Sequence, residues 1–224
     1  NATHSLNQIA KGLEWNKGDV VLTTDREHNS NLVPWLQLEQ EQGIDHRIVR
    51  SNQDNTFNLE SFEEACAEAG SKLKMVSMSH VGNLDGVEIP VKDITKIAKD
   101  YGALVSIDGA QSAPHMSVDV QDLGIDFYSF SIHKMLGPSG MGGLWGRTEL
   151  LENMRTIQSG GQTVTSSTYE SLEWAKPPSK FEGGLGHFAG MMATGAAIDY
   201  LTQLNMDEVH AHEQSLNKIM SEGV

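Results

Sequence analysis

Short apolar runs alternate with amphipathic segments along most of this chain. Runs bounded by turn residues predict strands at 19–24, 45–50, 73–79, 103–107, 125–130 and 142–146. Apolar residues spaced along one helical face predict helices at 5–15, 31–42, 59–69, 90–101, 189–204 and 206–220. Strands and helices in alternation predict an α/β domain, with helices on both faces of a mostly parallel sheet.

The central strands each deliver polar residues where they end. The run at 103–107 stops at Asp108, and the run at 125–130 stops before Ser131, His133 and Lys134. Ligands of open α/β sheets bind beyond the carboxyl ends of the strands, so an acid and a lysine are expected to face one crevice. Pyridoxal phosphate needs a lysine for its aldehyde and a carboxylate for its pyridine nitrogen. The pairing therefore suggests a pyridoxal phosphate site.

Local signals add detail at both ends of the chain. Thr3 or Ser5 is a plausible N-cap for the first helix, and Pro34 fits only the first turn of the second. Residues 158–190 are rich in Gly, Ser, Thr and Pro. So long an irregular segment in a compact domain is usually functional or covered by a partner.

Composition narrows the class of protein. A formal net charge of -14 over 224 residues argues against a nucleic-acid surface, which needs clustered Lys and Arg. No apolar run is long enough to span a membrane, and the single cysteine cannot form an internal disulfide. A soluble cytoplasmic protein without a metal site is expected.

Five ordered motifs make the reading specific. They are EHNSNLVPW at 27–35, HVGNLDGVEIP at 80–90, SIDGAQSAPH at 106–115, FYSFSIHKMLGPSGMGGLW at 127–145 and FEGG at 181–184. Together they resemble the class V aminotransferase family, most of all its cysteine desulfurase and selenocysteine lyase branch. The resemblance implies a fold type I pyridoxal phosphate domain with a mixed, mostly parallel, seven-stranded sheet. It also implies a large domain over 1–204 without its first segment, and a helix at 205–224 that leads to an absent small domain.

The resemblance assigns the catalytic roles. It implies that Lys134 holds the cofactor as a Schiff base and moves the substrate's α-proton, and that Asp108 pairs with the pyridine nitrogen. His28 is expected to stack on the ring and to take part in proton transfer. Read singly, the three residues could instead be a surface lysine, a turn cap and a histidine ahead of a helix.

Other residues are expected to hold the rest of the cofactor. Thr3, Ser131 and His133 are assigned to the phosphate, Thr3 because a helix N-terminus supplies backbone donors. Gln111 is assigned to the phenolic oxygen, with Asn83 near that oxygen and the substrate. Capping and turn formation are the alternative roles of these side chains.

Two positions depart from the branch. Leu185 stands where the branch usually has a threonine that reaches the neighbouring subunit's phosphate, so that contact is in doubt. Cys66 lies in the helix expected at 59–69, far in sequence from the branch's nucleophile, and is interpreted as a small packing residue. The branch draws that cysteine, and an arginine for the substrate carboxylate, from its small domain.

The resemblance implies β-elimination from cysteine or selenocysteine, giving alanine and passing sulfur or selenium on. A homodimer is expected, with residues 158–190 at or near its interface, and a sulfur-acceptor protein is a possible further partner. An aminotransferase or epimerase of the same class would need the same lysine and aspartate without a cysteine. A cofactor-free binding or structural remnant is the third possibility, and the presence of both Asp108 and Lys134 counts against it.

Overall fold

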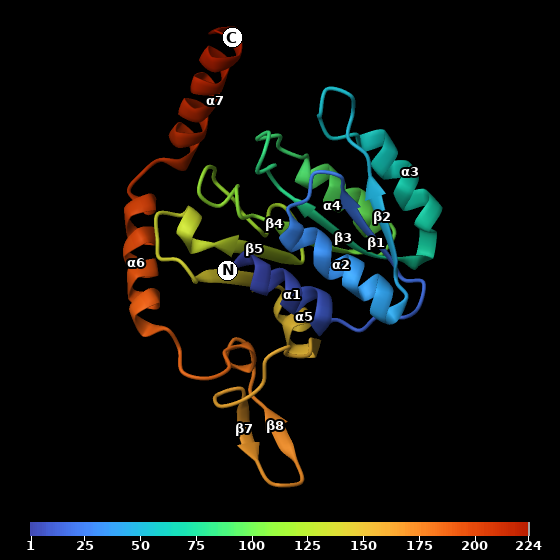
Figure 1. Ribbon diagram of the computed structural model, residues 1–224, viewed down its shortest axis with the longest axis vertical. Helices are drawn as coiled ribbons and strands as arrows, with labels where there is room; N and C mark the ends of the chain where they lie inside the picture. The colour runs from blue at the N-terminus through green and yellow to red at the C-terminus, as the bar shows by residue number, and fades with distance from the viewer. Residues whose placement is uncertain (224) are drawn as a thin grey trace.

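The computed structural model describes residues 1–223 (Figure 1). Its strands are β1 (Val20–Thr24), β2 (Asp45–Val49), β3 (Leu73–Ser79), β4 (Leu104–Asp108), β5 (Phe127–Ser131), β6 (Gly142–Gly146), β7 (Val164–Ser167) and β8 (Leu172–Trp174). Its helices are α1 (Ala2–Gly12), α2 (Asn29–Gln42), α3 (Leu59–Ala69), α4 (Val91–Asp100), α5 (Thr148–Asn153), α6 (Phe188–Thr202) and α7 (Met206–Gly223). Short 3-10 turns are η1 (Gly70–Lys72), η2 (Ile132–Lys134) and η3 (Ser179–Phe181).

The main sheet has the strand order β2-β1-β3-β4-β5-β6. Its first five strands are parallel and β6 runs antiparallel to β5, which confirms a mixed, mostly parallel sheet. The expectation of seven strands was wrong for the described residues, because this sheet has six. The two remaining strands, β7 and β8, pair with each other in a separate hairpin and do not extend an edge of the main sheet.

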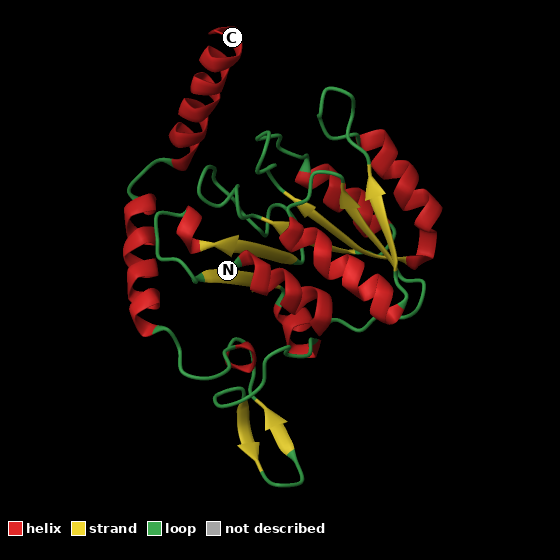
Figure 2. Ribbon diagram, viewed as in Figure 1, coloured by secondary structure: helices red, strands yellow, loops and turns green. Residues whose placement is uncertain are grey.

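Two hydrophobic cores lie on opposite faces of the main sheet, with α1 and α2 in front of it and α3 and α4 behind (Figure 2). Successive residues of a strand point to opposite faces, so Val20 and Leu22 enter one core and Val21 enters the other. Trp35 of α2 and Phe62 of α3 are fully buried on the two faces. Burial on both sides explains why these strands read as continuous apolar runs.

The first two helices begin earlier than the sequence pattern suggested. Asn1, not Thr3 or Ser5, caps α1: its side chain accepts a hydrogen bond from the backbone N–H of His4 at 3.1 Å. Helix α2 begins at Asn29, so Pro34 lies in its second turn rather than its first. Propensity alone did not find these starts, because an asparagine at the first residue and a histidine at position 28 supply the caps.

The C-terminal third is built differently. Residues 158–190 are less irregular than expected, since they contain the β7–β8 hairpin and η3. In Figure 1 the hairpin projects away from the sheet at the bottom, α6 stands at the left of the sheet, and α7 projects away from it at the top. Among residues 1–223, no helix has both the length and the apolar content needed to cross a membrane.

Candidate active site

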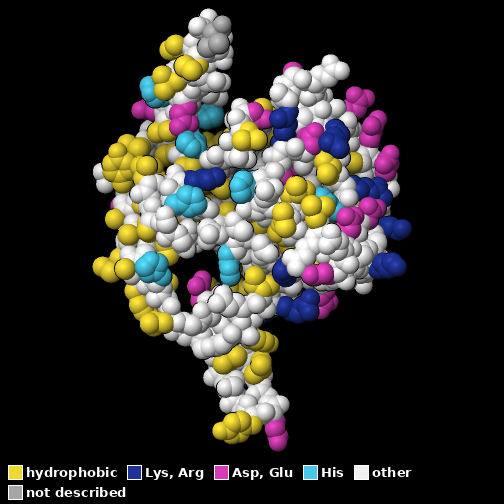
Figure 3. All heavy atoms as spheres, viewed as in Figure 1, with side chains coloured by type: hydrophobic (Ala, Val, Ile, Leu, Met, Phe, Trp, Pro, Cys, Tyr) yellow, Lys and Arg dark blue, Asp and Glu magenta, His cyan; other side chains and the backbone are white. Residues whose placement is uncertain are grey.

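All eight residues expected to form the site line one pocket of about 150 Å³ at the carboxyl ends of the central strands. The eight are Thr3, His28, Asn83, Asp108, Gln111, Ser131, His133 and Lys134. Six further residues complete the lining: Asn1, Ala2, Ser30, Ser79, Val81 and Ala110. Figure 3 shows several histidine side chains, spread from the upper left of the view to its centre. Among the described residues, no group of three His, Cys, Asp or Glu side chains is arranged to hold a metal ion.

Asp108 is the buried acid of the pocket. It ends β4, is 5% exposed, and its Oδ1 accepts a hydrogen bond from the backbone N–H of Ala110 at 3.0 Å. Burial raises the pKa of Asp108, while that bond and the positive charges of Lys134 and His28 act in the opposite direction. Within residues 1–223, Oδ2 accepts no hydrogen bond. This oxygen of a buried residue is therefore free to accept from a ligand N–H.

A tight turn after β5 presents Lys134. The lysine ends η2, and the chain then doubles back so that the backbone N–H of Gly137 donates to the carbonyl of Ile132 at 3.0 Å. A Cβ at Gly137 would lie 2.2 Å from Cγ2 of Ile132, so only glycine fits there. The turn holds Lys134 half-buried, three residues after the end of β5, the strand next to that of Asp108.

Close packing fixes the turn that follows Asp108. A Cβ at Gly109 would lie 1.9 Å from the ring of Tyr128, which packs directly beneath it. The hydroxyl groups of Tyr128 and Ser112 are hydrogen-bonded at 2.7 Å, and burial raises the pKa of Tyr128. The packing of Tyr128 against Gly109 and its hydrogen bond to Ser112 therefore hold the turn after Asp108 in place.

The start of α1 closes one side of the pocket. The backbone N–H of Ala2 donates to Oγ of buried Ser131 at 2.9 Å, so the end of β5 and the helix N-terminus are tied together. Thr3 lies in the first turn of the same helix. Backbone donors and the helix dipole at such an end favour an anion. His133 is exposed beside them.

His28 caps α2 with its own ring. Its Nδ1 accepts the backbone N–H of Ser30 at 3.1 Å and lies 2.9 Å from the hydroxyl of Ser30. The hydroxyl of Ser30 lies 2.6 Å from that of Thr3. Sequence reasoning did not single out Ser30, although its place two residues after His28 at a helix start could have suggested a capping partner.

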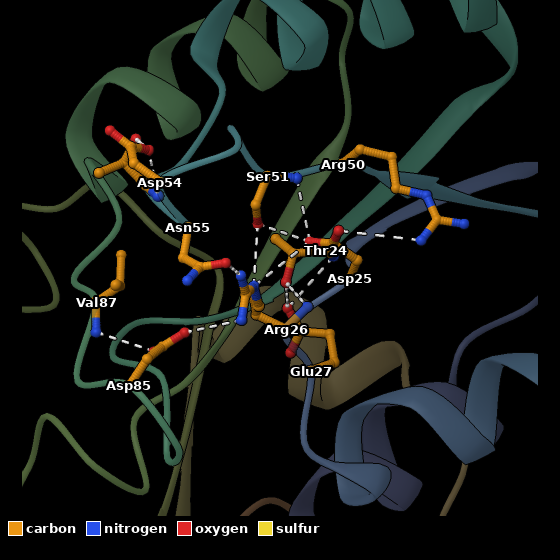
Figure 4. Close-up of polar contacts among 11 residues, drawn as sticks. Thr24, Asp25, Arg26, Glu27, Arg50, Ser51, Asp54, Asn55, Asp85 and Val87 are labelled. Atoms are coloured by element: carbon orange, nitrogen blue, oxygen red, sulfur yellow. Dashed lines mark hydrogen bonds and ion pairs between the residues drawn. The ribbon is translucent and has the colours of Figure 1, made fainter.

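Glu27 was also missed by sequence reasoning (Figure 4). Its carboxylate accepts hydrogen bonds from Thr24 Oγ1 at 2.6 Å, from Asn31 Nδ2 at 2.7 Å, and from both the backbone N–H and the hydroxyl of Ser79. Burial raises the pKa of Glu27, and these bonds oppose the rise. One side chain therefore joins the ends of β1 and β3 to the first turn of α2, directly beside His28.

Arg26 holds the loop that carries Asn83. Its guanidinium pairs with Asp85 at 3.2 Å and also donates to Asn55, so it bridges two loops at the end of the sheet (Figure 4). Asp85 in turn accepts the backbone N–H of Val87 at 3.1 Å. Asn83 is exposed at the rim of the pocket, two residues before Asp85.

The two unusual positions lie away from this pocket. Leu185 is 84% exposed in the loop before α6 and does not line the pocket. Cys66 is fully buried in the core behind the sheet. This burial agrees with its interpretation as a packing residue. Burial raises the pKa of its thiol to about 12.

The model of the family described as "Aminotransferase class-V" matches residues 1–224. The chain belongs to this family. A probable cysteine desulfurase of Streptomyces coelicolor is 41% identical over 226 residues, covering 97% of this chain and 53% of that protein. The chain spans about half the length of the curated relatives it matches.

Solved class-V structures confirm the fold. The apo structure of a cysteine desulfurase from Thermococcus onnurineus superposes with a TM-score of 0.94 and 33% identity, over 100% of this chain and 56% of that one. A C-DES mutant with glycine covalently linked to its PLP cofactor superposes with a TM-score of 0.82 and 24% identity, over 94% of this chain and 56% of that one. The α/β architecture predicted from the sequence is therefore that of this family.

Proposed function

We propose that the pocket binds pyridoxal 5'-phosphate and that the protein to which this chain belongs is a cysteine desulfurase or selenocysteine lyase. The observation that carries the proposal is the pairing of Asp108 and Lys134 at the ends of adjacent strands β4 and β5. The cysteine desulfurases among its relatives support the choice of substrate. When bound, the cofactor supplies an aldehyde for an amine and a ring that accepts electrons from the substrate.

The donor set fits that group. The free Oδ2 of Asp108 suits a pyridine N–H, and the amine of Lys134 suits the aldehyde. The start of α1, with Thr3, Ser131 and His133 around it, suits the phosphate. Gln111 and Asn83, which line the same pocket, supply amide groups for the ring oxygen and the substrate.

In this proposal Asp108, Lys134 and His28 have different tasks. Asp108 keeps the pyridine nitrogen protonated, and its charge is stabilised by the nearby cationic groups of Lys134 and His28. Lys134 first anchors the cofactor and then moves the substrate's α-proton through Nζ. His28 covers the ring and exchanges protons at Nε2, because hydrogen-bond donors occupy Nδ1.

Release of sulfur breaks the substrate's Cβ–S bond, passes the sulfur to a thiolate as a persulfide, and leaves alanine. Cys66 cannot be that thiolate, because it is fully buried and its pKa of about 12 keeps it protonated. It is the only cysteine of the 224 residues. The nucleophile therefore has to come from elsewhere in the full-length protein or from an acceptor protein.

The inaccessible thiol is also the observation that favours a second candidate function. An aminotransferase or epimerase uses the same Asp108 and Lys134 without a cysteine. Supplying the cofactor-loaded, full-length protein with L-cysteine and a reductant, and following sulfide and alanine, separates the two. The desulfurase proposal predicts both products in equal amounts, and formation of a keto acid or of D-cysteine instead would overturn it.

The same assay applied to this 224-residue chain alone should give no sulfide, because Cys66 cannot reach the substrate. Turnover equal to that of the full-length protein would contradict this assignment of the thiol. The variant Cys66→Ala provides the control: any residual sulfide formation should be unchanged in it.

We also propose a homodimer in which residues 158–190 lie at or near the interface. Tyr169, Leu172 and Trp174 of the β7–β8 hairpin expose apolar surface, and such surface is typical of a contact with another protein. Sedimentation of the full-length protein at micromolar concentration should show a dimer, and a monomer would contradict the proposal.

A further inference from the structure

Three side chains from the starts of two helices form a continuous chain of hydrogen bonds at the rim of the pocket. Thr3 of α1 contacts Ser30 of α2 at 2.6 Å, and Ser30 contacts Nδ1 of His28 at 2.9 Å. All three line the pocket. Thr3 and His28 are proposed site residues, and Ser30 links them.

The backbone fixes the direction of this chain. The N–H of Ser30 can only donate, and it donates to Nδ1 of His28 at 3.1 Å, so Nδ1 carries no proton. In the 2.9 Å contact the hydroxyl of Ser30 is then the donor, and it shares the single lone pair of Nδ1 with the N–H. Each hydroxyl has one proton. The arrangement in which both contacts are hydrogen bonds therefore has Thr3 donating to Ser30 and Ser30 donating to His28.

We propose that Ser30 is a positioning residue of this pocket: its hydroxyl relays a hydrogen bond from Thr3 to Nδ1 of His28, which leaves Nε2 as the proton-carrying nitrogen of the ring. The hydrogen bonds are properties of this chain. Their use in catalysis rests on the proposed function, in which His28 exchanges protons.

The relay also couples two parts of the pocket. An anion that binds at the start of α1 competes with Ser30 for the single hydroxyl proton of Thr3. When the anion takes that proton, Ser30 loses a donor and its own bond to His28 changes. By linkage, the state of His28 and the occupation of the anion site influence each other.

Nitrogen-15 NMR of the cofactor-free 224-residue chain tests the relay at about pH 8.5, where histidine is neutral. The variant His28→Asn identifies the His28 signals among the nine histidines. The wild-type chain should show a protonated Nε2 and a hydrogen-bonded, unprotonated Nδ1. Inorganic phosphate should shift the Nδ1 signal. A proton on Nδ1, or no response to phosphate, would overturn the proposal without any variant.

Variants of Ser30 sharpen the test. Ser30→Ala should move the Nδ1 signal toward that of a weakly bonded nitrogen and abolish the phosphate response, while Ser30→Thr, which keeps the hydroxyl, should retain both. Ser61→Ala is the matched control, because Ser61 also lies in the first turn of a helix but outside the pocket. A wild-type Nδ1 signal and phosphate response in Ser30→Ala would refute the relay.

A second experiment tests the proposed function independently of the relay. Pyridoxal phosphate followed by borohydride should label Lys134 in both wild-type and Ser30→Ala chains. No label in either chain, together with an intact NMR signature, would refute the proposed function and leave the relay standing.

Discussion

The body of the molecule, residues 1–154, and its C-terminal part, residues 155–223, differ in how far they bury their hydrophobic side chains. Apart from Ala197, every buried hydrophobic residue of the described chain lies in the body. The C-terminal part exposes Tyr169, Met192 and Ile219 over half or more of their surface, and α7 buries no residue. The body buries most of its large apolar side chains, whereas the C-terminal part leaves most of its own exposed.

Electrostatics divides along the same boundary. In the body, the carboxylate of Glu27 accepts from several donors and that of Asp108 from one, and burial raises the pKa of both. In the C-terminal part, the contact of α7 with the body is a pair between Glu213 and His115 at 2.7 Å, with both side chains more than 40% exposed. All residues that line the candidate site lie in the body.

The largest effect is expected for Asp108→Asn in the cofactor-loaded protein. The neutral amide cannot hold the proton on the pyridine nitrogen, so loss of the substrate's α-proton should slow by about 100-fold or more while cofactor binding remains measurable. Exchange of the α-proton of an amino acid in D2O, followed by proton NMR, measures this. Asp207→Asn in α7 should leave the rate unchanged, and a wild-type rate in Asp108→Asn would remove the electron-sink role.

The pH dependence of stability should reveal buried His80. Burial lowers its pKa from 6.5 to about 4, and Oε1 of Glu88 is 4.0 Å from its Nε2. Between these pKa values the unfolded chain binds a proton that the folded chain does not, so stability is lost as pH falls through this window. The loss should approach about 3 kcal/mol.

The variant His80→Gln isolates the contribution of His80 to the pH dependence of stability. Glu27 and Asp108 have raised pKa values and contribute in the opposite direction, since the folded state holds their protons more tightly. Their contributions cancel in the difference between wild type and variant, measured by urea unfolding at several pH values. A difference that does not change with pH would show that His80 is not held neutral.

A matched pair of substitutions compares the two regions directly. Glu27→Gln can place its amide N–H₂ against the N–H groups of Asn31 and Ser79, which only donate, and should lower the free energy of unfolding by about 2 kcal/mol. Glu213→Gln breaks an exposed pair and should lower it by less than about 1 kcal/mol. Equal losses by urea denaturation would erase the distinction between body and C-terminal part.

The smallest effect on stability is expected at the hairpin tip. Tyr169 is fully exposed, so Tyr169→Ser should change the free energy of unfolding by less than about 0.5 kcal/mol. Its effect should be seen instead in sedimentation of the full-length protein as weaker self-association. An unchanged dimerisation affinity would contradict an interface at the hairpin.

Sequence patterns predicted the body better than the C-terminal part, for a physical reason. Strands β1, β3, β4 and β5 are buried on both faces. Such strands consist largely of apolar residues, so their positions could be recognised as apolar runs in the sequence. The hairpin β7–β8 buries almost nothing, and its polar sequence therefore gave no strand signal. The strand number of seven came from the resemblance and not from any apolar run.

The candidate site divides in the same way. Asp108 and Lys134 could be predicted because each follows directly on a buried strand. Glu27 and Ser30 could not, because their importance lies in partners such as Ser79 and Thr3, which are distant in sequence and meet them only in the folded chain. A sequence shows which side chains end a strand, but not which of them bond to one another across the sheet.

The central claim, that the body binds pyridoxal phosphate through Lys134, is tested most directly by reducing the cofactor-treated chain with borohydride and mapping the labelled peptide. The account predicts one label, on Lys134, with no label in Lys134→Ala and an unchanged label in the surface variant Lys176→Ala. A label on another lysine, or none on the wild-type chain, would contradict it.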